Sequence, residues 1–365
     1  MLRILKKKII FRRYKQVKIL SDFNFNLDIH PFFLFNTNEL NVYYLIISLI
    51  KKIYFYITNN SQPIRVIYFK EVISSLDPKI VISSELSRVS FKVKKYFVNI
   101  ICLTYQQASY FENMQELTPL IYANEKTDYF FLHSKYYLKF FDFIDTNFLF
   151  SGSLKINEKS YQKISNKYDI MFISEFREKE LSQNLLSLSN LSDSQNNFKN
   201  TISVYVLKLL SEYCLVNDKK IAVALSSNRK DKANSGISKK KEINFFKKYL
   251  KNNFHYEDCD SFDLSEKCNL IICLTSNLGP ELLMLKKKVL FLNPDFFILN
   301  WQILPNKEGP FWYKGSSKNK IFTKIDELLN MNEYDWKDIL NKSNLDLNYD
   351  FKNTALKNLI VKLLS

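Results

Sequence analysis

Short apolar runs alternate with helix-length stretches along most of the sequence, and this alternation constrains the fold most strongly. One series of strand-like runs ends near residues 83, 105, 133 and 151, and a second ends near residues 174, 225, 274 and 293. Connections of helix length between strands are typical of parallel sheets. The rhythm changes at Gly152. We therefore predict an α/β protein with two Rossmann-like domains that face each other across a cleft.

The length of 365 residues also favours two domains. We place the first at residues 1–150 and the second at 151–350, and we expect a closing helix in 351–365 to pack back on the first. Hydrophobic residues make up 46% of the chain and charged residues 25%, which is ordinary for a globular protein.

Glycine is scarce, with five residues in the whole chain. Their spacing forms neither a dinucleotide-binding G-x-G-x-x-G nor a P-loop, and no G-x-S-x-G elbow is present. Five cysteines without a C-x-x-C pair and three widely spaced histidines make a zinc site or a disulfide framework a poor fit. Asp258-x-Asp260 has metal-ligand spacing, but two acids in a loop are common. We expect no metal and no cofactor.

The chain carries a formal charge of +16, and residues 1–20 hold eight basic residues and no acid. This charge favours, in decreasing order, a solvated basic arm, binding to an anionic membrane surface, and binding to nucleic acid. Nucleic acid comes last because no nucleic-acid-binding motif accompanies the charge. No apolar run reaches the ~20 residues of a spanning helix, and no signal peptide is recognisable. We expect a cytoplasmic protein, at most peripheral at the inner face of the plasma membrane.

One motif that could bind a ligand lies between a predicted strand and a helix in the second series. It contains Thr275, Ser276, Asn277, Gly279 and Glu281. Small polar residues at this position leave backbone N–H groups for a phosphate, and the helix dipole favours negative charge there. Glu281 could accept hydrogen bonds from ribose hydroxyls. Ordinary capping of the helix by Ser276 or Asn277 is the competing interpretation.

A second group of polar residues follows two strands of the first series. Glu85 comes after the strand at 79–83, and Gln106 and Gln107 come after the strand at 99–105. Ligand crevices form at such carboxyl ends of parallel strands, where a carboxylate could act as a general base. Charge complementarity at a helix start is the alternative for Glu85. We read His133 as a packed core residue within an apolar strand.

Several segments together carry a family resemblance over roughly residues 65–345. They are DPKIVISSE (77–85), YFVNIICLTYQQ (96–107), DYFFLHSKYY (128–137), SGSLKIN (151–157), YDIMFISEFRE (168–178), LTSNLGPELLMLKKKVLFLN (274–293) and GPFWYKG (309–315). In this order, they resemble bacterial surface-carbohydrate (capsule and O-antigen-type) biosynthesis proteins, which are similar to glycosyltransferases of the GT-B fold. The chain departs from that pattern at Gln106-Gln107-Ala108, where the family tends to have Gln-Asn-Gly.

The resemblance implies a metal-independent glycosyltransferase that moves a sugar from a nucleotide-activated donor (CMP- or NDP-linked) to a glycan or lipid-linked acceptor. The C-terminal domain would bind the donor, with Ser276 and Asn277 on phosphate and Glu281 on ribose. The N-terminal domain would bind the acceptor, with Glu85 as the base, and Trp312 could stack on a sugar ring. The alternatives are a nucleotide-sugar epimerase of the same architecture and a non-catalytic basic module that binds a membrane or a nucleic acid.

Overall fold

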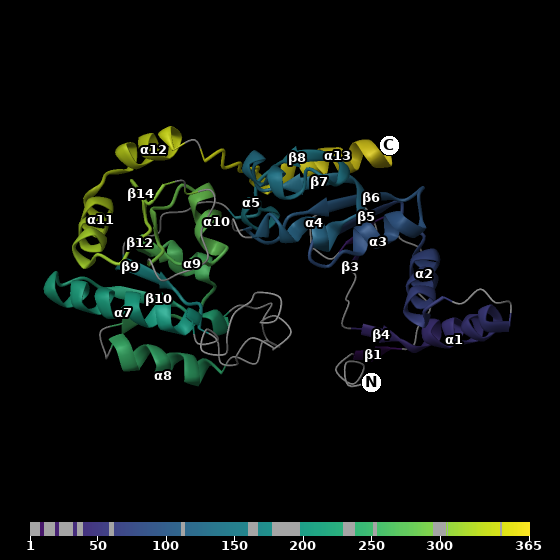
Figure 1. Cartoon of the computed structure of the whole chain (residues 1–365), viewed down its shortest axis with the longest axis horizontal. Coiled ribbons are helices and arrows are strands. Elements are labelled where there is room, and N and C mark those ends of the chain that lie inside the picture. The colour runs from purple at the N-terminus through teal and green to yellow at the C-terminus, as the bar shows by residue number, and fades with distance from the viewer. Residues whose placement is uncertain are drawn as a thin grey trace. The chain divides into compact units, whose positions relative to one another are not determined.

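The computed structural model describes residues 8–10, 19–21, 32–34, 39–57, 62–110, 114–159, 167–176, 198–228, 238–250, 254–294, 304, 306–343 and 345–365. Most of the predicted basic arm therefore lies outside the described residues. The chain separates into two compact units (Figure 1). The first comprises Met1–Ala108, Glu116–Asn157 and Asp350–Ser365, and the second comprises Ser109–Gln115 and Glu158–Tyr349.

The first unit is built on a six-stranded parallel sheet. Its strands, in spatial order, are β3 (Phe32–Leu34), β2 (Ile19–Ser21), β5 (Ile80–Ser84), β6 (Ile101–Tyr105), β7 (Lys126–Leu132) and β8 (Asp145–Phe150). β1 (Lys8–Ile10) and β4 (Glu39–Asn41) form a separate parallel pair. The sequence pattern predicts β5 to β8, whereas the three-residue strands of the first 41 residues escape it because they are too short to show a period.

Helices cover both faces of this sheet because side chains alternate along each strand. Val81 and Cys102 pack with α2 (Ile64–Leu76) and α3 (Val89–Tyr96) on one face. Ile80, Ile82 and Leu103 pack on the other face with Leu356 and Ile360 of α13 (Thr354–Leu364). The closing helix is therefore part of the first unit's core, and Figure 1 shows α13 and α3 on opposite sides of the sheet.

The remaining helical elements of the first unit are short or lie at its end. They are α1 (Val42–Ile57), α4 (Leu117–Tyr122), α5 (Leu154–Asn157) and two 3-10 segments at Lys135–Phe140 and Phe351–Asn353. The aromatic segment at Lys135–Phe140 has 3-10 geometry over six residues. Buried Tyr137, Phe140 and Phe141 are spaced by three and one, which suits the threefold repeat of a 3-10 turn.

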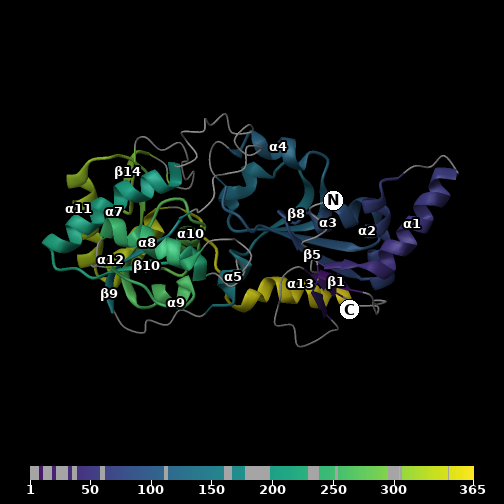
Figure 2. The ribbon, with the colours of Figure 1, turned by 90° about the horizontal axis from the view of Figure 1, so that it is seen from below.

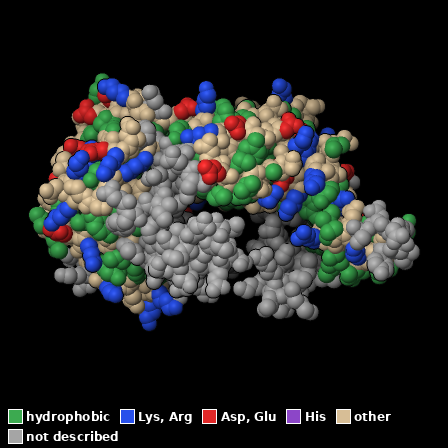
Figure 3. Space-filling model, in the orientation of Figure 1, with side chains coloured by type: hydrophobic (Ala, Val, Ile, Leu, Met, Phe, Trp, Pro, Cys, Tyr) green, Lys and Arg blue, Asp and Glu red, His purple; other side chains and the backbone are tan. Residues whose placement is uncertain are grey.

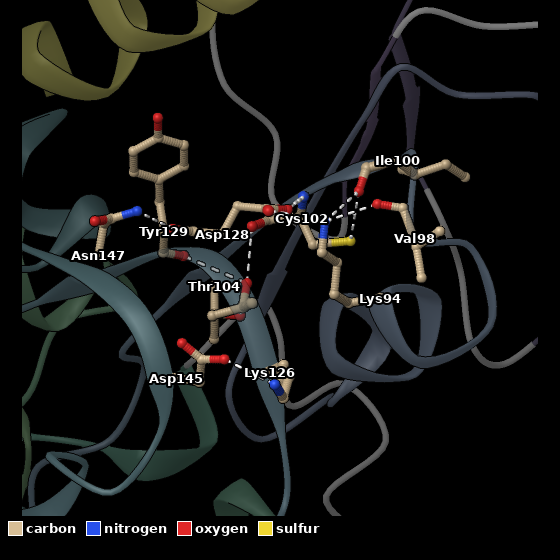
Figure 4. Close-up of polar contacts among 11 residues, drawn as sticks. Lys94, Val98, Ile100, Cys102, Thr104, Lys126, Asp128, Tyr129, Asp145 and Asn147 are labelled. Atoms are coloured by element: carbon tan, nitrogen blue, oxygen red, sulfur yellow. Dashed lines mark hydrogen bonds and ion pairs between the residues drawn. The ribbon is translucent and has the colours of Figure 1, made fainter.

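Polar pairs fix the register near the amino ends of β6, β7 and β8 (Figure 4). The β7–β8 register shifts between Lys126 and Tyr129. Within this irregular stretch, the Asp128 carboxylate accepts the backbone N–H of Cys102 at 2.8 Å and pairs with Lys94 at 2.8 Å. Asp128 thus replaces a backbone acceptor of the ladder. Burial, and then the Asp128 charge, raise the pKa of the Cys102 thiol to about 12.

The second unit contains a seven-stranded sheet. Its spatial order is β11 (Phe254–His255), β10 (Ile221–Ala224), β9 (Tyr168–Ile173), β12 (Cys268–Cys273), β13 (Val289–Leu292), β15 (Trp312–Tyr313) and β14 (Glu308–Gly309). All neighbours pair in parallel except β14 and β15. Its helices are α7 (Phe198–Val216), α8 (Lys239–Leu250), α9 (Ser261–Ser265), α10 (Leu278–Met284), α11 (Lys318–Asn330) and α12 (Glu333–Lys342).

In chain order, this second sheet runs 3-2-1-4-5 from β11 to β13, which is the Rossmann order. The first sheet has its earliest strand, β2, between β3 and β5, which is the flavodoxin-like order. The predicted α/β class with two Rossmann-like units is confirmed. The cleft between them stays a prediction.

Among the described helices, none has the length and apolar character needed to cross a membrane.

Candidate functional site

Each sheet has one point where its strand order reverses, and a doubly wound sheet binds ligands outside the carboxyl ends of the strands there. In the second unit, the reversal lies between β9 and β12. In the first unit it lies between β2 and β5. Glu175 follows β9, Thr275 follows β12, and Glu85 follows β5. Both groups of predicted site residues therefore lie beside a reversal point.

Glu175 joins the two strand ends in the second unit. Its carboxylate accepts hydrogen bonds from both the backbone N–H and the hydroxyl of Thr275. Glu175 and Thr275 are each 6% exposed. Because a buried carboxylate needs several donors to offset its desolvation, this pair fixes the loop after β12 to the end of β9.

Glu242 of α8 is a second buried carboxylate at this edge. It accepts the Ser174 hydroxyl and the backbone N–H groups of Ser226 and Ser227, the last two at 2.8 and 2.9 Å. Together, Glu175 and Glu242 hold the loops after β9, β10 and β12 in place. Neither glutamate is among the site residues predicted from the sequence, although Glu175 follows β9 closely, as Glu85 follows β5.

The loop from Thr275 to Glu281 uses several of its own N–H groups, which corrects the expectation that they would be free for a phosphate. The N–H of Thr275 donates to Glu175, and that of Leu278 to the Ser276 hydroxyl at 3.3 Å. The N–H of Gly279 donates to the Ser276 carbonyl at 3.1 Å. Asn277 Oδ1 accepts the N–H of Ser109 at 3.1 Å, and Ser109 belongs to the same unit.

Close packing explains Gly279. A β-carbon there would lie 2.4 Å from the Cys273 sulfur and 2.8 Å from Phe291 Cε1. The absence of a side chain therefore lets α10 approach β12 and β13. Glu281 lies in the first turn of the same helix and is 8% exposed. Every residue of α10 is buried, so this helix belongs to the core that supports the site.

Trp312 lies on β15 and is 5% exposed. Its ring fills the space over Gly309, and Phe311 contacts it edge-on with a centroid distance of 5.0 Å. These contacts give Trp312 a packing role, and its stacking on a sugar ring stays a prediction.

Glu85 is fully buried at the end of β5. Its two carboxylate oxygens accept the backbone N–H groups of Gln107 and Ala108, at 2.7 and 3.0 Å. These two hydrogen bonds offset part of the cost of burying the carboxylate. The contacts therefore make Glu85 the residue that positions the loop after β6, with Gln107 itself exposed at that edge.

Gln106 links the end of β6 to the end of β7. Its side-chain oxygen accepts the backbone N–H of His133 at 3.0 Å, and its amide nitrogen donates to the Ala108 carbonyl at 2.7 Å. The Gln106 carbonyl lies 2.9 Å from His133 Nε2. Because a carbonyl oxygen only accepts, the hydrogen-bond network assigns the ring proton to Nε2 and leaves a lone pair on Nδ1.

His133 also lies at this edge, and the prediction that it is a packed residue is confirmed, because it is 1% exposed. β7 ends at Leu132, so His133 lies past the strand rather than inside it. Among the described residues, its Nδ1 has no hydrogen-bond partner, and neither do the buried hydroxyls of Ser134 and Ser151. Burial lowers the pKa of His133 to about 4, against the opposing effect of the Gln106 hydrogen bond. The imidazole is therefore neutral at pH 7.

The Asp258-x-Asp260 pair is engaged in local structure. Asp258 pairs with Lys239 at 2.7 Å, and Asp260 caps α9 by accepting the N–H of Phe262 at 2.9 Å. Within the described ranges, no three His, Cys, Asp or Glu side chains gather as a metal site would require.

A cavity of about 450 Å³ lies at the opposite, amino-terminal edge of the second sheet. Met284, Leu285 and Trp336 are among its apolar lining residues, and Lys286 and Lys337 are among its basic ones. Its described lining contains none of the predicted site residues.

Comparison with known proteins gives the family. Residues 113–364, more than half of the chain, match the model of a family described as "putative O-antigen biosynthesis protein". The chain belongs to this O-antigen biosynthesis family. The match includes both the His133 segment and the Thr275–Glu281 loop. It confirms the resemblance to surface-carbohydrate biosynthesis proteins. No curated protein matches this family member by sequence.

Several solved structures are similar to this member of the O-antigen biosynthesis family. UDP-GlcNAc 2-epimerase from Methanocaldococcus jannaschii is 15% identical with a TM-score of 0.48, over 97% of this chain and 99% of that chain. Sucrose-phosphate synthase from Thermosynechococcus elongatus is 12% identical with a TM-score of 0.45, over 83% and 78%. TarM is 11% identical with a TM-score of 0.45, over 82% of this chain but 58% of its own. The fold assignment rests on the strand orders above.

Proposed function

We propose that the chain is a glycosyltransferase that moves a sugar from a nucleotide-activated donor onto an O-antigen-type glycan or its lipid-linked precursor. The observation that carries the proposal is the polar loop system at the strand-order reversal of the second unit, where Glu175 fixes Thr275, in a chain of an O-antigen biosynthesis family. Assembly of such a glycan requires the transfer of activated sugars, and Rossmann-type sheets bind nucleotides at this position.

The donor nucleotide binds at the second unit in this proposal. Ser276 and Asn277 contact the phosphates, and Glu281 contacts the ribose. Ser276 is 8% exposed, and its hydroxyl accepts the Leu278 N–H at 3.3 Å, which holds this side chain in the loop at the start of α10. Thr275 fixes the loop to the end of β9 through Glu175. Gly279 allows α10 to pack closely against β12 and β13.

The acceptor sugar binds at the first unit. Its hydroxyl oxygen attacks the anomeric carbon of the donor, the bond from that carbon to the phosphate oxygen breaks, and the hydroxyl proton passes to a base. We assign the base to Nδ1 of His133, because this lone pair has no hydrogen-bond partner among the described residues. Glu85 acts as a positioning residue, since both of its oxygens already accept N–H groups of the neighbouring loop.

Product analysis tests this proposal. The full chain is incubated with a panel of CMP-, UDP-, GDP- and dTDP-linked sugars, with and without glycan acceptors, and the products are resolved by mass spectrometry and NMR. Release of the nucleotide with transfer or hydrolysis of the sugar supports a glycosyltransferase. A new stereoisomer of an intact nucleotide sugar would replace the proposal with an epimerase, and unchanged donors throughout would contradict both activities.

A further inference from the structure

Helix α1 of the first unit presents an apolar outer face. Five large residues are between 47% and 63% exposed: Ile46, Leu49, Ile50, Ile53 and Tyr54. Their spacing of three, one, three and one places them on one side of the helix. We refer to these five residues as the α1 stripe. Large exposed apolar faces of this kind mark interaction sites in soluble proteins.

The other side of α1 is already occupied by its own unit. Tyr44 and Ser48 are buried, and the Tyr44 hydroxyl bonds the Ser75 hydroxyl of α2 at 2.5 Å. Lys51 pairs with Glu71 of α2 at 2.7 Å. Figure 2 shows α1 beside α2 at one end of the first unit. The packing that folds the unit therefore fixes α1 with its apolar stripe outward.

Basic residues accompany the stripe in the sequence. The α1 sequence contains Lys51 and Lys52 and no acidic residue. β1 pairs with β4 in the register Lys8–Glu39 to Ile10–Asn41, and α1 begins at the next residue, Val42. The strand flanked in sequence by Lys6, Lys7, Arg12 and Arg13 thus runs beside the start of α1. Figure 3 shows hydrophobic and basic side chains next to one another at the α1 end of this unit.

We propose that α1 and the adjacent β1 segment form a docking surface for an anionic membrane. An outward apolar stripe enters the headgroup boundary, while nearby basic residues are attracted to anionic lipids. At 16 residues, α1 is shorter than a spanning helix, so it lies on the surface. A second copy of the chain is the less favourable occupant, because two faces of like positive charge repel each other.

Vesicle co-sedimentation of the full chain tests the proposal. Vesicles contain either phosphatidylcholine alone or phosphatidylcholine with phosphatidylglycerol. We expect binding to the anionic vesicles that falls as salt rises, since exposed charges are screened over about 10 Å at 0.1 M. The double substitution Ile50→Ser and Ile53→Ser should weaken this binding by about tenfold or more, because it removes two side chains that enter the lipid.

Matched variants distinguish loss of the α1 stripe from general effects of a substitution on vesicle binding. Val216→Ser removes an apolar side chain that is 76% exposed on the second unit and should leave vesicle binding unchanged. Lys6→Gln, Lys7→Gln and Lys8→Gln together should weaken binding and flatten its salt dependence. Melting curves of the Ile50 and Ile53 variants should match the parent, since both side chains are mostly exposed.

Three results would overturn the proposal: no binding of the full chain to anionic vesicles, binding that the stripe substitutions leave intact, or a stripe-dependent dimer in sedimentation velocity without lipid binding. None of these readouts requires catalytic activity, so they are independent of the glycosyltransferase assay.

Discussion

The Glu175 carboxylate accepts both the backbone N–H and the hydroxyl of Thr275, one hundred residues later in the chain. This contact joins the ends of β9 and β12, where the strand order of the second sheet reverses. These two hydrogen bonds therefore position the loop of the proposed nucleotide site and also stabilise the core.

Replacement of Glu175 by Gln tests that relationship. The amide keeps one acceptor oxygen and directs N–H groups at a donor, which leaves buried polar groups unpaired. We expect a loss of about 1–3 kcal/mol in the free energy of unfolding and a lower Tm. Glu116→Gln, at an exposed glutamate, should change neither. Chemical denaturation measures both, and parental stability of the Glu175 variant would contradict the structural role.

Gly279 offers a second test, because its packing and phosphate-binding interpretations predict different results. A methyl group at this position would collide with Cys273 and Phe291. We expect Gly279→Ala to destabilise the fold by about 1–3 kcal/mol, typical of an overpacked core. Adding Cys273→Ala should restore part of the loss in a double-mutant cycle. Full stability with reduced nucleotide affinity would favour direct phosphate contact instead.

The buried imidazole of His133 makes stability depend on pH. Its pKa is lowered to about 4, whereas an unfolded histidine titrates near 6.5. The unfolded state therefore binds the proton first as the pH falls, and the folded state loses about 3 kcal/mol between pH 6.5 and pH 4. Denaturation across this range should show that loss in the parent and its absence in His133→Gln. The exposed His255→Gln provides the control.

Much of the fold could be predicted because β5, β9, β10, β12 and β13 are apolar runs that are buried along most of their length and are separated by longer segments. The boundary of β7 could not. His133 continues an apolar run in the sequence, but the strand ends one residue earlier, so this buried residue lies at the carboxyl end of the strand rather than inside it. The strands β2 and β3 were missed because a three-residue strand has too few side chains to display alternation.

The positions of the candidate residues in the fold could be predicted better than their contacts. Position after a parallel strand identified Glu85 and Gln106, and both lie at the carboxyl edge. Their partners are set by side chains distant in sequence, so the fully bonded state of Glu85 could not be inferred from its neighbours. The same rule, applied evenly, would have selected Glu175.

Turnover separates the base from the positioning residue. His133→Asn should lower transfer by about 10²- to 10⁴-fold with nucleotide affinity unchanged, because only the proton acceptor is lost. Glu85→Gln should lower the Tm, since a buried N–H group of Gln107 or Ala108 loses its acceptor. Transfer kinetics and melting curves are measured on both. Parental turnover in the His133 variant would remove it from the reaction.

Calorimetric titration of the full chain with CMP, UDP, GDP and dTDP tests the central claim most directly, namely that the second unit binds an activated-sugar nucleotide beside Ser276 and Glu281. We expect at least one nucleotide to bind, and Ser276→Ala and Glu281→Ala each to weaken it by about tenfold to a hundredfold, as expected for the loss of a hydrogen bond to a charged group. The absence of binding by any of the four, or equal affinity in both variants with only the Tm lowered, would contradict the account.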